Sequence, residues 1–178
     1  SDISDWTIHF VDTGLESPIG ERLRRVREYL GDDEYFLANY SDVLTDAPLD
    51  DMIERAVSAQ ATASMLIVPP QSSMHCVDVA STGEVKEIMP LTDFPVGVNG
   101  GYFVLNQEAI DLIPPGGDLV GDACFSLAGT GRLLGYRHDG FWQPADTFKE
   151  RAELDEGYNN GVRPWAVWES VGLQDVAQ

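Results

Sequence analysis

The hydrophobic pattern of the chain changes several times between the period of a β-strand and that of an α-helix. Trp6, Ile8 and Phe10 alternate with polar residues, which predicts a first strand with these side chains on one face. Residues 18–30 instead carry apolar side chains at helical spacing and predict an amphipathic helix. Gly31 follows directly, as expected for a residue that ends a helix.

The rest of the chain continues these two periods. We expect further strands at 35–39, 64–68, 96–105 and 132–138, and a β-hairpin at about 75–80 and 84–89. We expect helices at 48–59, 107–112, 119–129 and 146–158. Strands that alternate with helices predict an α/β protein, and the hairpin between them predicts a mixed sheet.

Length and composition narrow the possible classes. The 178 residues suit a single domain, and 43% apolar residues are enough for a core, which excludes global disorder. No apolar run approaches the roughly 20 residues that span a bilayer, and the first residues lack the features of a signal peptide. Cys76 and Cys124 are too few for a disulfide scaffold, so we expect two buried, reduced thiols in a cytoplasmic protein.

The net charge of −19 restricts the partners. The average field repels polyanions, which argues against nucleic acid and against anionic membrane surfaces. Basic side chains gather only in the helix expected at 18–30, as Arg22, Arg24, Arg25 and Arg27. We interpret most of this cluster as a solvated face paired with nearby acids, and one member as a possible phosphate clamp.

Two aspartates are the main candidates for metal chemistry. Asp42 follows the strand at 35–39, and ligands of open α/β sheets collect where strands end. A carboxylate there suits Mg²⁺, but it equally suits a turn or a helix N-cap; Asp46, in the same loop, is a weaker candidate. Asp146 precedes the last predicted helix, where an N-cap is the favoured role and a second Mg²⁺ carboxylate is the alternative. The two roles are compatible, because a capping carboxylate keeps a free oxygen.

Other motifs are less specific. Asn99, Gly100 and Gly101 interrupt an otherwise strand-like run, which predicts a bulge or a close backbone approach. Neither DTGL at 12–15 nor GTG at 129–131 has both the composition and the context of a phosphate-binding loop. The three histidines, His9, His75 and His138, are scattered, and the residues show no catalytic triad, so we expect structural roles for them.

Several segments occur together in a recognisable order. They are VDTG at 11–14, GERLRRV at 20–26, NGGYFVL at 99–105 and GFWQPADT at 140–147, followed by RPWAVWE at 163–169. This set resembles the sugar nucleotidyltransferase family, and within it the bacterial glucose-1-phosphate cytidylyltransferases. The resemblance implies a Rossmann-like fold with a mixed sheet. It covers 1–178 as a single partial domain, with about 147–178 as a helical extension.

The resemblance also implies an activity and a site. Members of the family transfer a nucleotidyl group from a nucleoside triphosphate to a sugar 1-phosphate and release pyrophosphate, with Mg²⁺ neutralising charge. By resemblance, Asp42 and Asp146 match the two Mg²⁺ carboxylates. Arg22 and Asn99 match contacts to the sugar phosphate or nucleotide, and Gly100 matches the close backbone approach beside the sugar.

The chain also departs from the family pattern. The Gly-x-Gly-Thr-Arg loop that cradles the triphosphate, with the N-terminal strands around it, has no counterpart here. The family's Tyr-Gly-Asp-Gly reads YSDV at 40–43, which removes two glycines beside the nucleotide. The family's Glu-Lys-Pro reads IMP at 88–90, which removes the positive charge that faces the sugar phosphate.

Three interpretations remain open. The chain is the C-terminal part of a nucleotidyltransferase, one subunit of a split enzyme, or a non-catalytic homologue that serves as a binding or assembly module. Alone, it is expected not to catalyse nucleotidyl transfer. A sheet that lacks its first strands exposes an edge, so we expect a homo-oligomer or a partner chain that completes the sheet.

Overall fold

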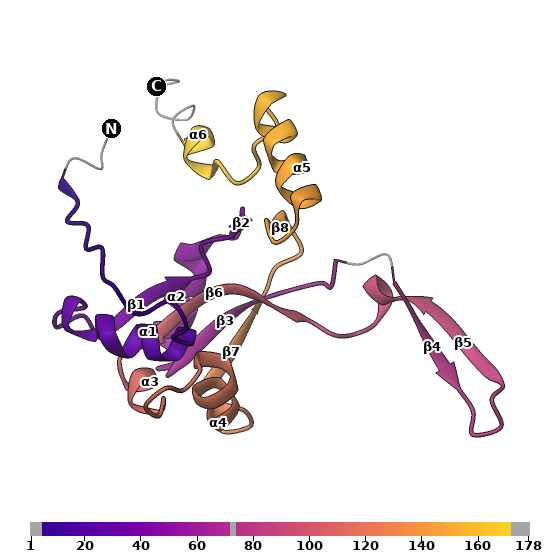
Figure 1. The fold of residues 1–178 in the computed structure, drawn as a ribbon, viewed down its shortest axis with the longest axis horizontal. Coiled ribbons are helices and arrows are strands. Elements are labelled where there is room, and N and C mark those ends of the chain that lie inside the picture. The colour runs from indigo at the N-terminus through magenta and orange to yellow at the C-terminus, as the bar shows by residue number, and fades with distance from the viewer. Residues whose placement is uncertain (1–4, 72–73, 172–178) are drawn as a thin grey trace. The chain divides into compact units, whose positions relative to one another are not determined.

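The structure is a computed structural model that describes residues 5–71 and 74–171 (Figure 1). Its strands are β1 (Tyr35–Asn39), β2 (Val43–Thr45), β3 (Ala63–Val68), β4 (His75–Val79), β5 (Val85–Pro90), β6 (Val98–Asn106), β7 (Leu133–Arg137) and β8 (Trp142–Pro144). Its α-helices are α1 (Ile19–Val26), α2 (Leu49–Ser58), α3 (Glu108–Asp111), α4 (Phe125–Leu127), α5 (Phe148–Asn159) and α6 (Val167–Val171). Two 3₁₀ turns, η2 (Arg27–Tyr29) and η3 (Leu91–Asp93), and a π-helix, η4 (Leu119–Cys124), complete the list.

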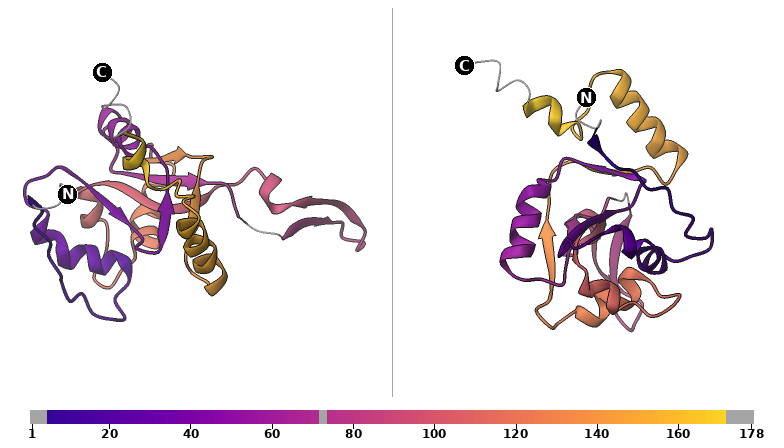
Figure 2. Two further views of the ribbon diagram at one scale, coloured as in Figure 1. Left: turned by 90° about the horizontal axis from the view of Figure 1, so that it is seen from above. Right: turned by 90° about the vertical axis from the view of Figure 1, so that its left-hand side faces the viewer.

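The strands form three sheets. Four strands pair in the order β1-β6-β3-β7, whereas β2 pairs with β8 and β4 pairs with β5 in two-stranded sheets. The views in Figure 2 show the β4–β5 pair as a ribbon of two neighbouring strands. Most elements expected from hydrophobic period are therefore confirmed, but β2 and β8 were not predicted, because strands this short carry no detectable period.

The strand expected from Trp6, Ile8 and Phe10 is wrong. Residues 6–11 have no regular structure, and the Phe10 side chain is 95% exposed. Alternation of apolar residues stabilises a strand only where a neighbouring strand and a core cover it. Within the part of the chain that the structure describes, no strand pairs with this segment.

Residue contacts divide the chain into two compact units. Unit 1 comprises Ser1–Ala38, Met52–Ser64 and Phe103–Leu134, and unit 2 comprises Asn39–Asp51, Met65–Tyr102 and Gly135–Gln178. The expectation of a single partial domain, with about 147–178 as a helical extension, stays a prediction. No helix among the described residues is long and apolar enough to cross a membrane.

Unit 1 holds most of the buried apolar side chains. Met52, Phe103, Leu105, Ile110 and Leu119 are each at most 2% exposed. In unit 2 the buried apolar residues are Val43, Ala47, Leu66, Val68 and Ala166. Burial of apolar side chains is the main stabilising contribution to folding, so unit 1 carries most of it.

The basic cluster of α1 and η2 is largely held by bonds within unit 1. Arg24 donates to the Ile113 carbonyl oxygen at 2.7 Å, and Arg27 pairs with Asp111. Glu21 accepts from the Gly116 N–H and from Arg25, and these bonds hold the pKa of its carboxyl below the usual value. The expectation that most of these arginines are paired is confirmed.

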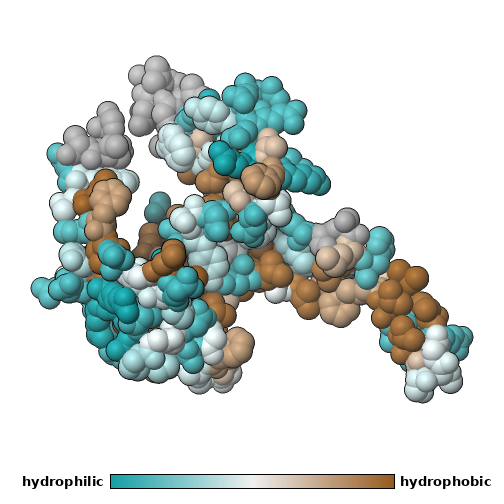
Figure 3. Space-filling model, viewed as in Figure 1, coloured by the Kyte–Doolittle hydropathy of each residue, from teal (hydrophilic) through white to brown (hydrophobic). Residues whose placement is uncertain are grey.

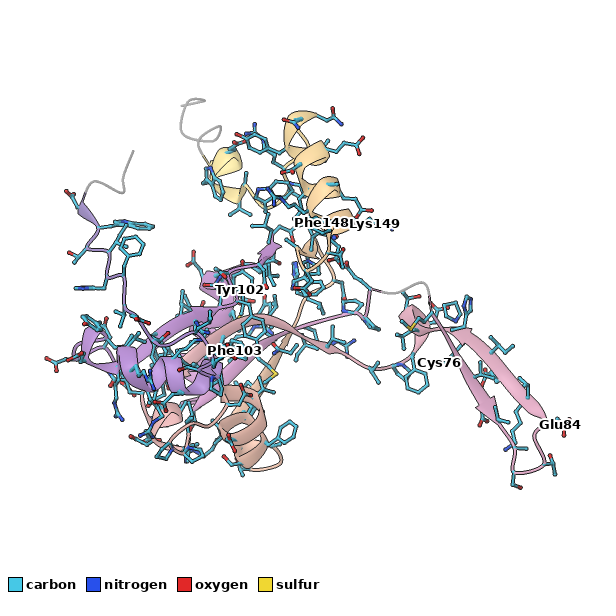
Figure 4. The ribbon with its side chains drawn as sticks, in the orientation of Figure 1. Cys76, Glu84, Tyr102, Phe103, Phe148 and Lys149 are labelled. Carbon is cyan, nitrogen blue, oxygen red and sulfur yellow. The ribbon has the colours of Figure 1, made fainter. Side chains whose placement is uncertain are left out.

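The two cysteines differ in their environment. Cys124 is 2% exposed, and burial, with the Asp118 charge adding to it, raises the pKa of its thiol to about 11. Cys76 is only half-buried on β4 (Figure 4), so the expectation of two buried thiols is wrong for Cys76.

This difference predicts selective modification. At about pH 8 a thiol reagent should label Cys76 and spare Cys124 until the protein unfolds, because the thiolate is the reactive form. Above an ordinary pKa of 9.0 the unfolded Cys124 thiol loses its proton while the folded one keeps it. The free energy of unfolding should therefore fall as the pH rises from 9.0 towards about 11. Peptide mass spectrometry after labelling measures the first effect, and equal labelling of both thiols in folded protein would contradict it.

Candidate functional site

One short antiparallel ribbon, formed by β2 and β8, sets the positions of the two predicted metal carboxylates. Strands β2 and β8 pair with the register Val43↔Pro144, Leu44↔Gln143 and Thr45↔Trp142. The next backbone bond runs from the Ala145 N–H to the Asp42 carbonyl oxygen, at 2.8 Å. The ribbon therefore brings Asp42 and Asp146, which are far apart in the sequence, to the same end of one pair of strands.

The N-cap interpretation of Asp146 is wrong. Thr147 caps α5, and a capping box joins it to Glu150, whose carboxylate accepts from the Thr147 N–H at 2.8 Å. Asp146 is exposed just outside the helix, as is Asp42 in the turn before β2. Neither carboxylate makes a hydrogen bond or ion pair with a residue that the structure describes.

This donor set fits Mg²⁺. The ion takes oxygen ligands and is usually bound through one or two carboxylates together with substrate phosphates and water. Two accessible carboxylates at one end of a ribbon meet that requirement. The described residues contain no cluster of three or more histidine, cysteine or acidic side chains for a closed protein site.

The other end of the ribbon carries a histidine–carboxylate contact. His138 Nε2 lies 2.7 Å from Asp46 Oδ1, and the histidine side chain is only 11% exposed. Asp46 was a weak metal candidate and His138 was expected to be structural. The structure joins them to each other at the opposite end of the ribbon from Asp42.

Gly100 and Asn99 lie on β6 of the same unit. The Trp142 Nε1–H donates to the Gly100 carbonyl oxygen at 2.8 Å, which connects β8 to this glycine. A Cβ at Gly100 would come 3.0 Å from the Leu66 side chain, so the tight contact at this glycine is made by a buried core residue. Asn99 donates to the Tyr40 hydroxyl at 3.2 Å and accepts from the Gly101 N–H at 2.9 Å. Substrate contact by Asn99 and Gly100 stays a prediction.

An open groove of about 640 Å³ lies in unit 2, within the size range of small-molecule sites. Pro144 and Thr147, which flank Asp146 in sequence, line it. Met74, Leu91 and Val98 form its apolar part, and α5 contributes charged side chains, with Lys149 in its first turn (Figure 4). The groove therefore combines apolar surface with polar groups, and Thr147, the residue after Asp146, lines it.

Arg22 belongs to unit 1, whereas the other predicted site residues belong to unit 2. Its Nε donates to the Ser17 carbonyl oxygen at 2.8 Å, and its Nη2 donates to the Leu15 carbonyl oxygen at 2.9 Å. Arg22 thus organises the loop before α1. These two bonds do not bear on the predicted contact between Arg22 and a phosphate, which stays a prediction.

The altered sugar-phosphate motif lies on the β4–β5 hairpin. Met89 is paired across the hairpin with Cys76, and both side chains are half-buried. They line a cavity of about 440 Å³ together with Asp78, Glu87 and Phe94. Among the residues that the structure describes, no basic side chain lines this cavity, so none of them replaces the positive charge that the family has at the position of Met89.

Sequence reasoning missed the Asp46–His138 contact, Trp142 and Lys149. No local signal marks a contact between residues so far apart in the sequence. The run GFWQPADT was recognised, but it shows neither that Trp142 bonds to Gly100 nor that Lys149 lines a groove. A co-varying pair of positions in an alignment would be the usual signal for such contacts.

Comparison with known proteins finds relatives that match most of this chain. No protein-family profile matches the chain. The glucose-1-phosphate cytidylyltransferases of Salmonella typhimurium and Salmonella typhi are each 34% identical over 170 residues, which is 94% of this chain and 65% of the relative. The chain is a partial-length match to these cytidylyltransferases. It therefore spans less than two thirds of the relatives it matches.

Solved structures agree on the fold. The UTP-bound UGPase of Acinetobacter baumannii superposes with a TM-score of 0.59 at 22% identity, over 92% of this chain and 62% of that one. The expected fold class is confirmed as Rossmann-like α/β with a mixed sheet. A sequence identity of 22% supports the shared fold but does not assign a role to any residue of this chain.

Proposed function

We propose that this chain provides the metal-binding and sugar-binding part of a sugar-1-phosphate nucleotidyltransferase. The observation that carries the proposal is the β2–β8 ribbon, which has Asp42 and Asp146 at the same end, each with a carboxylate that bonds to no residue that the structure describes. The partial match to glucose-1-phosphate cytidylyltransferases supports the same reaction, NTP plus sugar 1-phosphate to NDP-sugar plus pyrophosphate.

The residues divide the work of this reaction. Bound Mg²⁺ would neutralise the charge that develops on the phosphates during in-line attack. Asp42 and Asp146 would hold the ion. Asn99 and Gly100, whose carbonyl oxygen is bonded by the Trp142 indole, would lie on the sugar side of the site, and the groove would supply apolar surface.

A second candidate is a non-catalytic homologue that acts as a binding or assembly module. The observation that favours it is the cavity beside Met89, which has no basic side chain for the sugar phosphate. The presence of Asp42 and Asp146, the two proposed metal ligands, favours the first candidate, a part of an active enzyme. Nucleoside triphosphate and sugar 1-phosphate remain the proposed ligands, and the two free thiols suit a reducing, cytoplasmic location.

Pyrophosphate release separates these candidates. The chain alone, with CTP, Mg²⁺ and glucose 1-phosphate, should release pyrophosphate at the background rate. A fusion that adds the unmatched part of the Salmonella typhimurium relative should release it well above background and form CDP-glucose. A fusion that binds Mg²⁺ but does not turn over would favour the non-catalytic module.

We also propose that the chain self-associates through the β4–β5 hairpin. Val77 pairs with Ile88 across the hairpin, and Val79 pairs with Val85, each between 50% and 61% exposed. Figure 3 shows the apolar surface along the hairpin. A two-stranded hairpin is only marginally stable in water, and β4 and β5 pair with no other strand in the described part of the chain. The same face of a second copy is the partner that we propose to cover it.

Charge on this apolar face should separate the copies. The Ile88→Glu variant should elute and scatter light as a monomer where the wild-type chain is a dimer or larger, because a desolvated carboxylate at the interface is costly. Glu87→Gln, on the other face of β5, is the matched control and should keep the wild-type mass. A monomeric wild-type chain at micromolar concentration would refute the proposal.

A further inference from the structure

The Asp46–His138 contact has no role in the proposed reaction, yet it is tightly built. His138 Nε2 and Asp46 Oδ1 are 2.7 Å apart, with the two side chains 11% and 33% exposed. A Cβ at Gly140 would lie 2.6 Å from Asp46 Oδ1 and equally close to His138 Cε1. Only glycine at position 140 leaves room for the pair.

The contact closes one end of the β2–β8 ribbon. Asp46 directly follows β2, and its N–H donates to the Phe141 carbonyl oxygen at 3.1 Å. The Thr45 hydroxyl donates to the same oxygen at 2.8 Å. The His138 N–H donates to the Ile67 carbonyl oxygen on β3 at 2.9 Å, which attaches this end of the ribbon to a second strand.

The opposite end of the ribbon carries Asp42 and Asp146. The ribbon has three residue pairs, and the bond from the Ala145 N–H to the Asp42 carbonyl oxygen continues the pairing beyond Val43 and Pro144. A slip of one residue would turn every side chain of a strand to the other face. Asp42 and Asp46 are separated by about 13 Å of extended chain, so Asp46 acts on the carboxylates through strand register and not by contact.

We propose that Asp46 and His138 form a positioning pair that holds the register of β2 and β8 and thereby places Asp42 and Asp146 around one Mg²⁺ ion. The inference rests on the proposed function, since Mg²⁺ is the ion expected at these carboxylates. Residues outside the direct ligands of a metal site commonly change its affinity by about 10- to 100-fold. Other bonds, including that from the Ala145 N–H, support the same register, so the lower figure is expected here.

A Mg²⁺ titration of the intact chain tests the pair. The ¹H–¹⁵N shifts of Val43, Leu44 and Ala145 report on the carboxylate end, below the temperature at which any variant unfolds. His138→Phe keeps a ring but loses the nitrogen, and should weaken Mg²⁺ binding about tenfold. His138→Gln keeps an N–H donor near Nε2 and should bind nearly as well as wild type.

Further variants make each outcome decisive. His75→Phe, at an exposed histidine on β4, should bind Mg²⁺ as the wild type does. Asp46→Ala, which removes the acceptor of the contact, should repeat the loss if His138→Phe does not fold. Unchanged Mg²⁺ affinity in folded His138→Phe and Asp46→Ala would overturn the inference, even if both variants melt earlier. Asp42→Asn and Asp146→Asn test the metal site itself. If neither weakens the Mg²⁺ response, the proposed function fails; if both do and the pair variants do not, only the positioning role fails.

Discussion

The Asp146→Asn variant is expected to lower nucleotidyl transfer by the fusion enzyme about a hundredfold or more. A bound metal ion contributes several kcal/mol of charge stabilisation in such a transition state, and each 1.36 kcal/mol is a factor of about ten in rate. The amide replaces one metal oxygen and removes a negative charge. Pyrophosphate release measured at saturating substrates and Mg²⁺ checks the loss.

The fold should be unaffected by this substitution. Asp146 is exposed, makes no bond to a described residue, and does not cap α5, because Thr147 does. The melting temperature should therefore stay within about a degree of wild type, as for most surface substitutions. Asp32→Asn, at an exposed turn position of unit 1, is the control and should retain full activity. Full activity in the Asp146→Asn enzyme would remove this residue from the site.

The Gly20→Ala variant is expected to destabilise unit 1 by about 1–3 kcal/mol, the usual cost of overpacking. Gly20 is the buried residue of α1. A Cβ there would lie 2.6 Å from the Gly117 carbonyl oxygen and 2.7 Å from the Asp118 carbonyl carbon. Both are backbone atoms, so the clash cannot be relieved by a side-chain rotation. It should outweigh the gain of up to about 1 kcal/mol that alanine brings to a helix.

Gly121→Ala is the matched control. The nearest atom to a Cβ at Gly121 is Asp118 Oδ1 at 3.5 Å, an ordinary contact, so its stability should be close to wild type. Urea unfolding followed by circular dichroism measures both variants. A Gly20→Ala protein as stable as Gly121→Ala would show that α1 shifts away from the Gly117 backbone at little cost.

Whether the sequence alone predicts an element depends on how far apart in the chain the residues that stabilise it lie. The helix at α1, the strand at β3 and the hairpin at β4–β5 were predicted because the side chains that define their period are neighbours in the sequence. Trp6, Ile8 and Phe10 have the same local signal, but a strand also needs a partner, and the prediction failed. β2 and β8 have too few residues for a period, and only their pairing reveals them.

The candidate site shows the same division. Asp42, Asp146 and Gly100 were proposed from their places in the sequence and from the family resemblance, because short motifs can be recognised from consecutive residues alone. Their arrangement depends on bonds between distant segments, such as the Trp142 indole to Gly100 and the Asp46 carboxylate to His138.

Local periodicity and short sequence motifs were thus enough to predict the class of fold, the family resemblance and two candidate carboxylates. Three-dimensional pairing was needed to show that Thr147 and not Asp146 caps α5, that the two carboxylates share one end of a ribbon, and that His138 closes the other. Periodicity reports energies between residues a few positions apart, whereas strand register and cap choice are set by hydrogen bonds that form only when the chain has folded.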